Sequence, residues 1–119
     1  MFEDDARSNQ KTDSITIVNL TATASAASAR QLTSGKKRGG LAFLNVTAVG
    51  GVGPSMTVVL ETSDDGGVNW YPLPGGTFTA ATAVSRQILT LGQLGADIRA
   101  NYAITGTTPS ISFTVRCIV

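Results

Sequence analysis

The chain has 119 residues, which is enough for one domain with a buried core and too few for two. Charged residues make up 14% of it, against roughly 25% in typical soluble domains, and the net charge of +1 argues against a general nucleic-acid binder. The absence of histidine and the single cysteine exclude an intramolecular disulfide and a zinc site of the usual Cys/His kind.

Surface polarity must therefore come mainly from Thr, Ser, Asn and Gly, whose burial costs far less than burial of ammonium or carboxylate groups. This composition favours a chain that packs against other chains; an extracellular β-domain with a neutral surface is the alternative. No apolar run approaches the ~20 residues that cross a bilayer, and the N-terminus lacks the basic-then-apolar order of a signal peptide. We expect a protein without membrane contact, made in the cytoplasm and kept there until it assembles.

Residues 1–13 are polar and aperiodic, and Phe2 is their only aromatic side chain. Such a segment cannot bury enough surface to order itself, so it is predicted to be a free arm or an arm that docks on a neighbour. We expect residues 14–119 to form a single β-sandwich domain.

The rest of the chain alternates between apolar and polar residues in short runs, with turn-forming residues between them. No stretch keeps a helical period, so about eight antiparallel strands in a sandwich or jelly roll are expected. The predicted strands cover residues 14–20, 40–49, 56–62, 77–81, 85–91, 97–105 and 111–117, with an extended continuation over 21–29. The predicted turns cover residues 34–40, 50–55, 72–76, 92–95 and 106–109.

The most distinctive local motif is the hairpin turn that begins at Ser63 and ends at Trp70. Acidic side chains here can accept backbone N–H groups, the glycines accept positive φ, and the indole of Trp70 is expected to fold back over the turn. The spacing of Ser63, Asp65, Gly67 and Trp70 resembles the Asp-box, a hairpin motif of sialidase propellers, secreted β-proteins and many phage virion proteins. That resemblance implies a structural role, and a single copy with about eight strands excludes a propeller.

Ligand-binding, metal and catalytic sites are weaker interpretations of these residues than a structural role. Trp70, Tyr71 and Tyr102 could form a sugar-stacking platform, and Glu61, Asp64 and Asp65 could coordinate calcium, although the EF-hand order is absent. Cys117 falls on the inward positions of the last strand and has no histidine to activate it, so it is interpreted as a core residue. We expect no catalytic residue, metal or cofactor, and no enzyme activity.

A basic stretch without acids runs from Arg30 through Lys36, Lys37 and Arg38. Gly35 and Lys36 lack the spacing and the helix of a phosphate-binding loop, and so small a patch would bind nucleic acid weakly at physiological salt. A solvated loop and a contact with an acidic patch on a neighbouring subunit both remain open. The acidic group that would pair with this basic stretch is the N-terminal arm, either of another copy or of a partner. The candidate contacts in the arm are Phe2, Glu3, Asp4 and Asp5.

Residues 56–119 resemble a recurring pattern of phage virion proteins: an alternating strand, the Asp-box-like turn, a Pro-containing loop, a strand and a final pair of strands. The resemblance implies a capsid decoration (cement) protein or another accessory virion protein with a β-sandwich, commonly trimeric. Its partners would be the major capsid protein or other virion subunits, and its location the virion. A neck or tail component and a carbohydrate-binding β-sandwich module are the alternatives.

Overall fold

The computed structural model describes residues 14–33 and 39–119, and in these ranges it contains seven β-strands and no helix. The predicted all-β fold is therefore confirmed. The strands are β1 (Ser14–Ala22), β2 (Ala26–Ala27), β3 (Gln31–Leu32), β4 (Gly40–Ser63), β5 (Tyr71–Thr77), β6 (Ser85–Leu91) and β7 (Asp97–Ile118).

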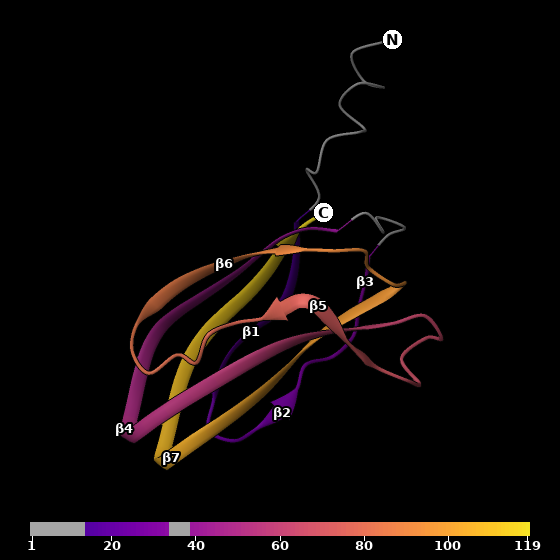
Figure 1. Cartoon of the computed structure of the whole chain (residues 1–119). Helices are drawn as coiled ribbons and strands as arrows, with labels where there is room; N and C mark the ends of the chain where they lie inside the picture. Colours follow the sequence, from indigo (N-terminus) through magenta and orange to yellow (C-terminus); the bar gives the residue numbers. More distant parts are fainter. Residues whose placement is uncertain (1–13, 34–38) are drawn as a thin grey trace.

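The architecture rests on two very long strands, β4 with 24 residues and β7 with 22, which pair antiparallel along almost their whole length. Both bend sharply at the same place, so the sheet folds over on itself (Figure 1). Residues 40–50 of β4 and 110–118 of β7, flanked by β6 and β1, form what we call the β1–β6 layer. Residues 55–63 and 97–105, flanked by β5 and by β2 and β3, form the β2–β5 layer.

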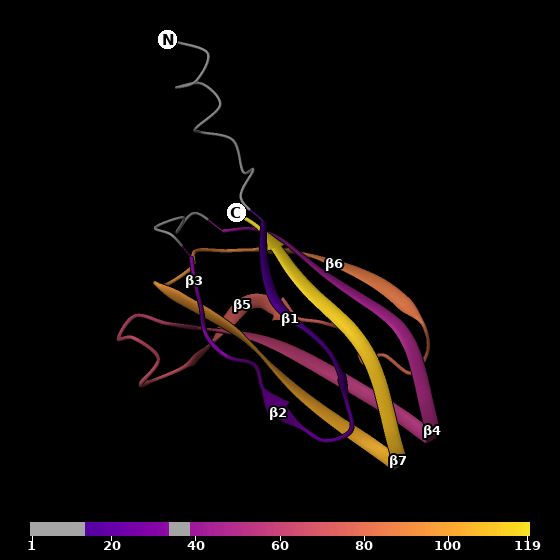
Figure 2. The same ribbon diagram turned by 180° about the vertical axis from the view of Figure 1, so that it is seen from behind.

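Figure 2, seen from behind, shows β1 beside the second half of β7, with β6 beyond β4 on the opposite edge of the same layer. All the strand pairs are antiparallel. The sandwich thus has four strand positions in each layer, and β4 and β7 supply the two central positions of both.

The bend was predicted as two separate turns, at 50–55 and 106–109, and this prediction is wrong. The two segments pair with each other across the fold, Gly50 with Ser110 and Val52 with Thr107, and the register shifts there absorb the extra residues. Gly51 has a φ of 98°, and a Cβ at this position would lie 2.6 Å from the carbonyl oxygen of Thr108. The glycines therefore make a paired bulge inside one continuous ribbon, because a bulge bends and twists the strand that carries it.

The core lies between the two layers and follows the two-residue period of the strands. The rings of Tyr102 and Phe113, which belong to opposite halves of β7, meet edge to face with centroids 5.3 Å apart. Cys117 is completely buried, as its inward position predicted, and burial raises the pKa of its thiol to about 12. The large side chains with less than 2% exposure include Phe78, Phe113, Leu44, Met56, Leu60, Ile98, Ile111, Val46, Val58 and Val115.

The strand after the Asp-box-like turn also differs from the prediction. Residues 72–76 were expected to turn and 77–81 to form a strand, but β5 spans Tyr71–Thr77 and includes Pro72. Among the described residues β5 pairs only with β4, so the missing proline N–H is tolerated at the sheet edge. Phe78 lies beyond the strand, and its N–H still donates to the carbonyl of Val58 at 3.0 Å.

Candidate functional site

The turn from Ser63 to Trp70, which we call the Asp-box turn, is held by a closed set of hydrogen bonds at the end of β4. The buried hydroxyl of Ser63 donates to Oδ1 of Asp65 at 2.7 Å and accepts the N–H of Gly67 at 3.0 Å. Asp65 also accepts the backbone N–H groups of Val68 at 3.1 Å and Asn69 at 3.0 Å, and the Asn69 side-chain amide at 2.6 Å. The turn is therefore wound around one carboxylate.

These donors change the titration of Asp65. The backbone N–H of Asn69, the Ser63 hydroxyl and the Asn69 side-chain amide stabilise the ionised form and lower its pKa from 3.8 to about 2. Oδ1 of Asp65 thus accepts three hydrogen bonds and Oδ2 accepts one, all from within the turn. Within residues 14–33 and 39–119, no three His, Cys, Asp or Glu side chains lie close enough together to hold a metal ion.

The indole of Trp70 packs over the turn. Its Nε1–H donates to the carbonyl of Gly67 at 3.0 Å, and a Cβ on Gly67 would come within 3.3 Å of the indole. The guanidinium of Arg99 lies 4.3 Å from the indole centroid, and its Nε donates to Glu61 at 2.8 Å. The indole is thus packed between the turn and a cation that is itself paired.

The proposed stacking platform for sugars is not formed. Tyr71 is 56% exposed, but Tyr102 is only 6% exposed and lies in the core against Phe113. Arg99 stacks on the indole of Trp70. The three aromatic residues therefore do not share one accessible surface.

Arg30, expected to belong to the basic stretch, is engaged with the Asp-box turn instead. Its Nη1 donates to the carbonyl of Gly66 at 2.6 Å and lies 3.6 Å from Oδ2 of Asp97. Asp97 is almost fully buried, and its Oδ1 has no hydrogen-bond partner within the described ranges. The arginine therefore ties the segment between β2 and β3 to the turn and offsets a buried charge. The other candidate contacts lie outside the described residues: Phe2, Glu3, Asp4, Asp5, Lys36, Lys37 and Arg38.

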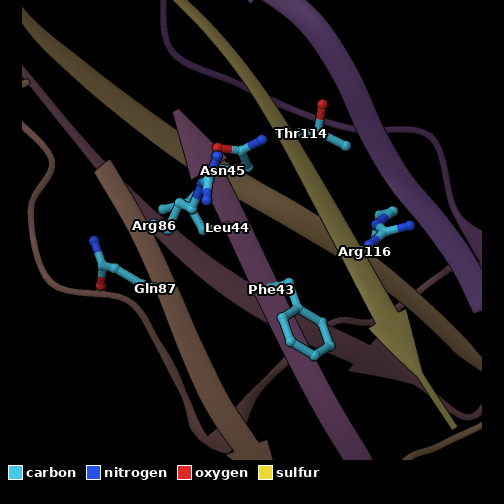
Figure 3. Close-up of a pocket in the computed structure, with 7 residues that line it drawn as sticks. All are labelled: Phe43, Leu44, Asn45, Arg86, Gln87, Thr114 and Arg116. Atoms are coloured by element: carbon cyan, nitrogen blue, oxygen red, sulfur yellow. The ribbon is translucent and has the colours of Figure 1, made fainter. Parts of the chain in front are cut away.

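A hollow of about 430 Å³ lies on the outer face of the β1–β6 layer, on the other side of the sandwich. Arg86 on β6 and Arg116 on β7 line it from the strands on either side of β4, and Phe43 of β4 lines it between them (Figure 3). The residues that line it are Phe43, Leu44, Asn45, Arg86, Gln87, Thr114 and Arg116. None of these residues was expected from the sequence to form a site, although both arginines stand at outward positions of alternating strands.

The described charges are divided unevenly between the layers. All four described acids, Glu61, Asp64, Asp65 and Asp97, lie in the β2–β5 layer or in the Asp-box turn at its end. Arg30 and Arg99 lie there too, and each pairs with an acid. Arg86 and Arg116 belong to the β1–β6 layer, where neither guanidinium has an ion-pair or hydrogen-bond partner in the described part of the chain. The exposed hollow is thus positively charged, and no described residue neutralises it.

The fold defines this chain as an all-β protein built on one folded antiparallel sheet. No protein-family model matches it, and no curated protein matches it significantly. Among solved structures it is similar to the crystal structure of SPBc2 prophage-derived protein YomS, with a TM-score of 0.50 and 12% sequence identity. The match covers 90% of this chain and 92% of that one, so the shared fold extends over nearly the whole of both.

At that identity the similarity concerns the fold alone. No helix of sufficient length and apolar character to span a bilayer occurs in residues 14–33 and 39–119.

Proposed function

We propose that this chain is a non-enzymatic structural protein of a phage virion, and that it decorates the outside of the assembled head. The observation that carries the proposal is the end-to-end fold similarity to a prophage-derived protein. It agrees with the virion-protein pattern of residues 56–119, which rests on the sequence and not on the fold comparison.

The chemistry of the surface is suited to contact with other subunits. Only 14% of the residues are charged, and several of these are used internally, as in the pairs Arg99–Glu61 and Arg30–Asp97. A surface of hydroxyl and amide groups is less costly to desolvate than one of free charges. Binding to a shell would then stabilise it by mass action, by roughly 3 kcal/mol at a hundredfold excess of protein over Kd.

The state of the reactive side chains argues against catalysis. The chain has no histidine, its single thiol is buried with a raised pKa, and the Asp65 carboxylate accepts four hydrogen bonds from its own turn. We therefore propose a binding role, with the major capsid protein or another virion subunit as partner and a homo-oligomer, a trimer by preference, as the bound form.

The test uses phage particles that contain this protein. Shells stripped of it should rebind the purified full-length chain and regain heat resistance, measured as the temperature at which they release DNA. Heat-unfolded protein, added to the stripped shells in the same way, is the matched control and should not bind. Shells that neither bind the folded chain nor gain heat resistance would rule out the decoration role.

A neck or tail component is the second candidate, because it needs the same fold and the same kind of surface. Copy number separates the two: a decoration protein is present in many copies per particle and a neck component in few. Quantitative mass spectrometry against the major capsid protein measures this ratio. A carbohydrate-binding module is disfavoured by the burial of Tyr102, and quenching of the single tryptophan by a glycan would restore it.

A further inference from the structure

The outer face of the β1–β6 layer has the chemistry of a docking site for a carboxylate-bearing segment. Arg86 lies opposite Asn45 and Arg116 opposite Phe43, so the two arginines flank β4 from its two neighbouring strands. Strands are spaced by about 4.8 Å, which puts β6 and β7 roughly 10 Å apart across β4. Guanidinium groups at that spacing can each bind one carboxylate with two parallel hydrogen bonds.

The apolar part of this face is equally unoccupied by the described residues. Phe43 is half-buried in the floor of the hollow, and Ile88, its partner on β6, is 57% exposed. An occupant with consecutive carboxylates and a neighbouring large apolar side chain would match both the charge and the apolar floor. Carboxylates alone would leave Ile88 exposed to water.

The chain itself contains such a segment. Phe2 is followed directly by Glu3, Asp4 and Asp5, and residues 1–13 hold four acids against two bases. We infer that this acidic arm of one copy docks in the arginine-flanked hollow of a second copy, between Arg86 and Arg116. The inference goes beyond the virion role and does not depend on it.

The position and length of the arm favour a second copy over its own hollow. Ser14 pairs with Ile118 and Thr16 with Arg116, so the arm joins the body one strand away from the hollow. Glu3, Asp4 and Asp5 lie nine or more positions before Ser14, and an extended chain of that length reaches up to roughly 30 Å. The strand register puts Arg116 one strand across and two residues along from Ser14, roughly 10 Å away, so the intervening residues would have to double back to reach the hollow of their own copy.

The experiment measures the mass of the full-length protein by light scattering over a wide range of concentration. The wild type is expected to associate, and Arg86→Gln/Arg116→Gln is expected to weaken the association by about tenfold or more in Kd, because two charge-assisted contacts are lost. Neutralising the arm with Glu3→Gln/Asp4→Gln/Asp5→Gln should weaken it comparably. Added salt should weaken the wild type as well.

A control pair carries the same change in net charge away from the hollow. Gln93→Glu/Asn101→Asp alters two exposed positions with little change in side-chain size. It lowers the net charge by the same amount as the loss of both arginines, and it should leave the association as in the wild type. A combined variant exchanges the charges of arm and hollow, with Glu3→Lys/Asp4→Lys/Asp5→Lys in the arm and Arg86→Glu/Arg116→Glu in the hollow. This variant should associate as the wild type does.

Three results would overturn the inference. One is a wild type that stays monomeric at all concentrations, which would also be the result if the arm folded onto its own hollow. Another is an association that survives loss of both arginines. The third is failure of the charge exchange in a variant whose melting temperature equals that of the wild type. None of these bears on binding to phage shells, so the decoration role is tested separately.

Discussion

The two layers of the sandwich share one core and two strands, but they differ in whether their charged side chains have partners within the fold. In the β2–β5 layer and the Asp-box turn at its end, Glu61, Asp65 and Asp97 are each met by an arginine or by donors of the turn. In the β1–β6 layer, Arg86 and Arg116 face outward over a hollow without a described acid beside them. Charges that are satisfied within the fold stabilise a local structure, whereas charges left free on a rigid face are available to a partner.

The largest expected effect tests the part that both layers share. Phe113 is 1% exposed and contacts Tyr102 from the opposite half of β7. Phe113→Ala should lower the free energy of unfolding by about 3–5 kcal/mol, because it leaves a cavity where the layers meet. Urea denaturation measures this. Thr114→Ala, the neighbour on the outer face, removes one exposed hydrogen bond to Asn19 and should cost no more than about 1 kcal/mol. Equal losses in both variants would mean that the layers do not depend on this contact.

The bend that separates the layers comes next. Gly51→Ala places a Cβ near the Thr108 carbonyl at a backbone φ of 98°, and a left-handed backbone costs a non-glycine residue about 1–2 kcal/mol before any clash. A clear fall in melting temperature is expected. Gly92, which has open space around it and no positive φ, provides the control, and Gly92→Ala should be far milder. A tolerated Gly51→Ala would show that the bend does not need its glycine.

The charge satisfied within the Asp-box turn should be visible in the dependence of stability on pH. Because the folded-state pKa of Asp65 is lowered from 3.8 to about 2, its contribution is full above the unfolded value and is lost as the pH falls from about 4 to about 2. Asp65→Asn should lower the melting temperature at neutral pH and flatten its decline over that acidic window. Asp64→Asn is the control, because the neighbouring Asp64 side chain has no hydrogen-bond or ion-pair partner in the described part of the chain, and it should keep the decline of the wild type. A steep decline that persists in Asp65→Asn would assign it to other carboxylates.

The smallest effect on stability is expected in the other layer. Arg86→Gln/Arg116→Gln removes two exposed charges without partners in the described part of the chain, so the melting temperature should stay close to that of the wild type, within about 0.5 kcal/mol in stability. Arg99→Gln, which breaks the contacts with Trp70 and Glu61, should cost about 1 kcal/mol. Equal costs would erase the difference between the layers.

Several features followed from the sequence because their causes are local. Alternation of apolar and polar residues identified six of the strand regions, and it placed Cys117 in the core. The folding of Trp70 over its turn also follows from residues within eight positions of one another. Such features need no knowledge of the distant chain.

Other features depended on which segments meet. The glycines at 50–53 and 106 are typical of turns, and only their pairing across the sheet makes them a bulged bend. Tyr102 alternates like any inward residue, but its contact with Phe113 removes it from a sugar-binding surface. Neither outcome could be obtained from a local pattern.

By itself, the sequence determined an all-β chain with a self-contained Asp-box turn, because strand alternation and turn hydrogen bonds act over a few residues. The tertiary structure alone decided that β4 and β7 fold over together, that Arg30 reaches the buried Asp97, and that Arg86 and Arg116 flank a common hollow. These arrangements join residues tens of positions apart, and the register of a sheet between them is set by packing across the whole core.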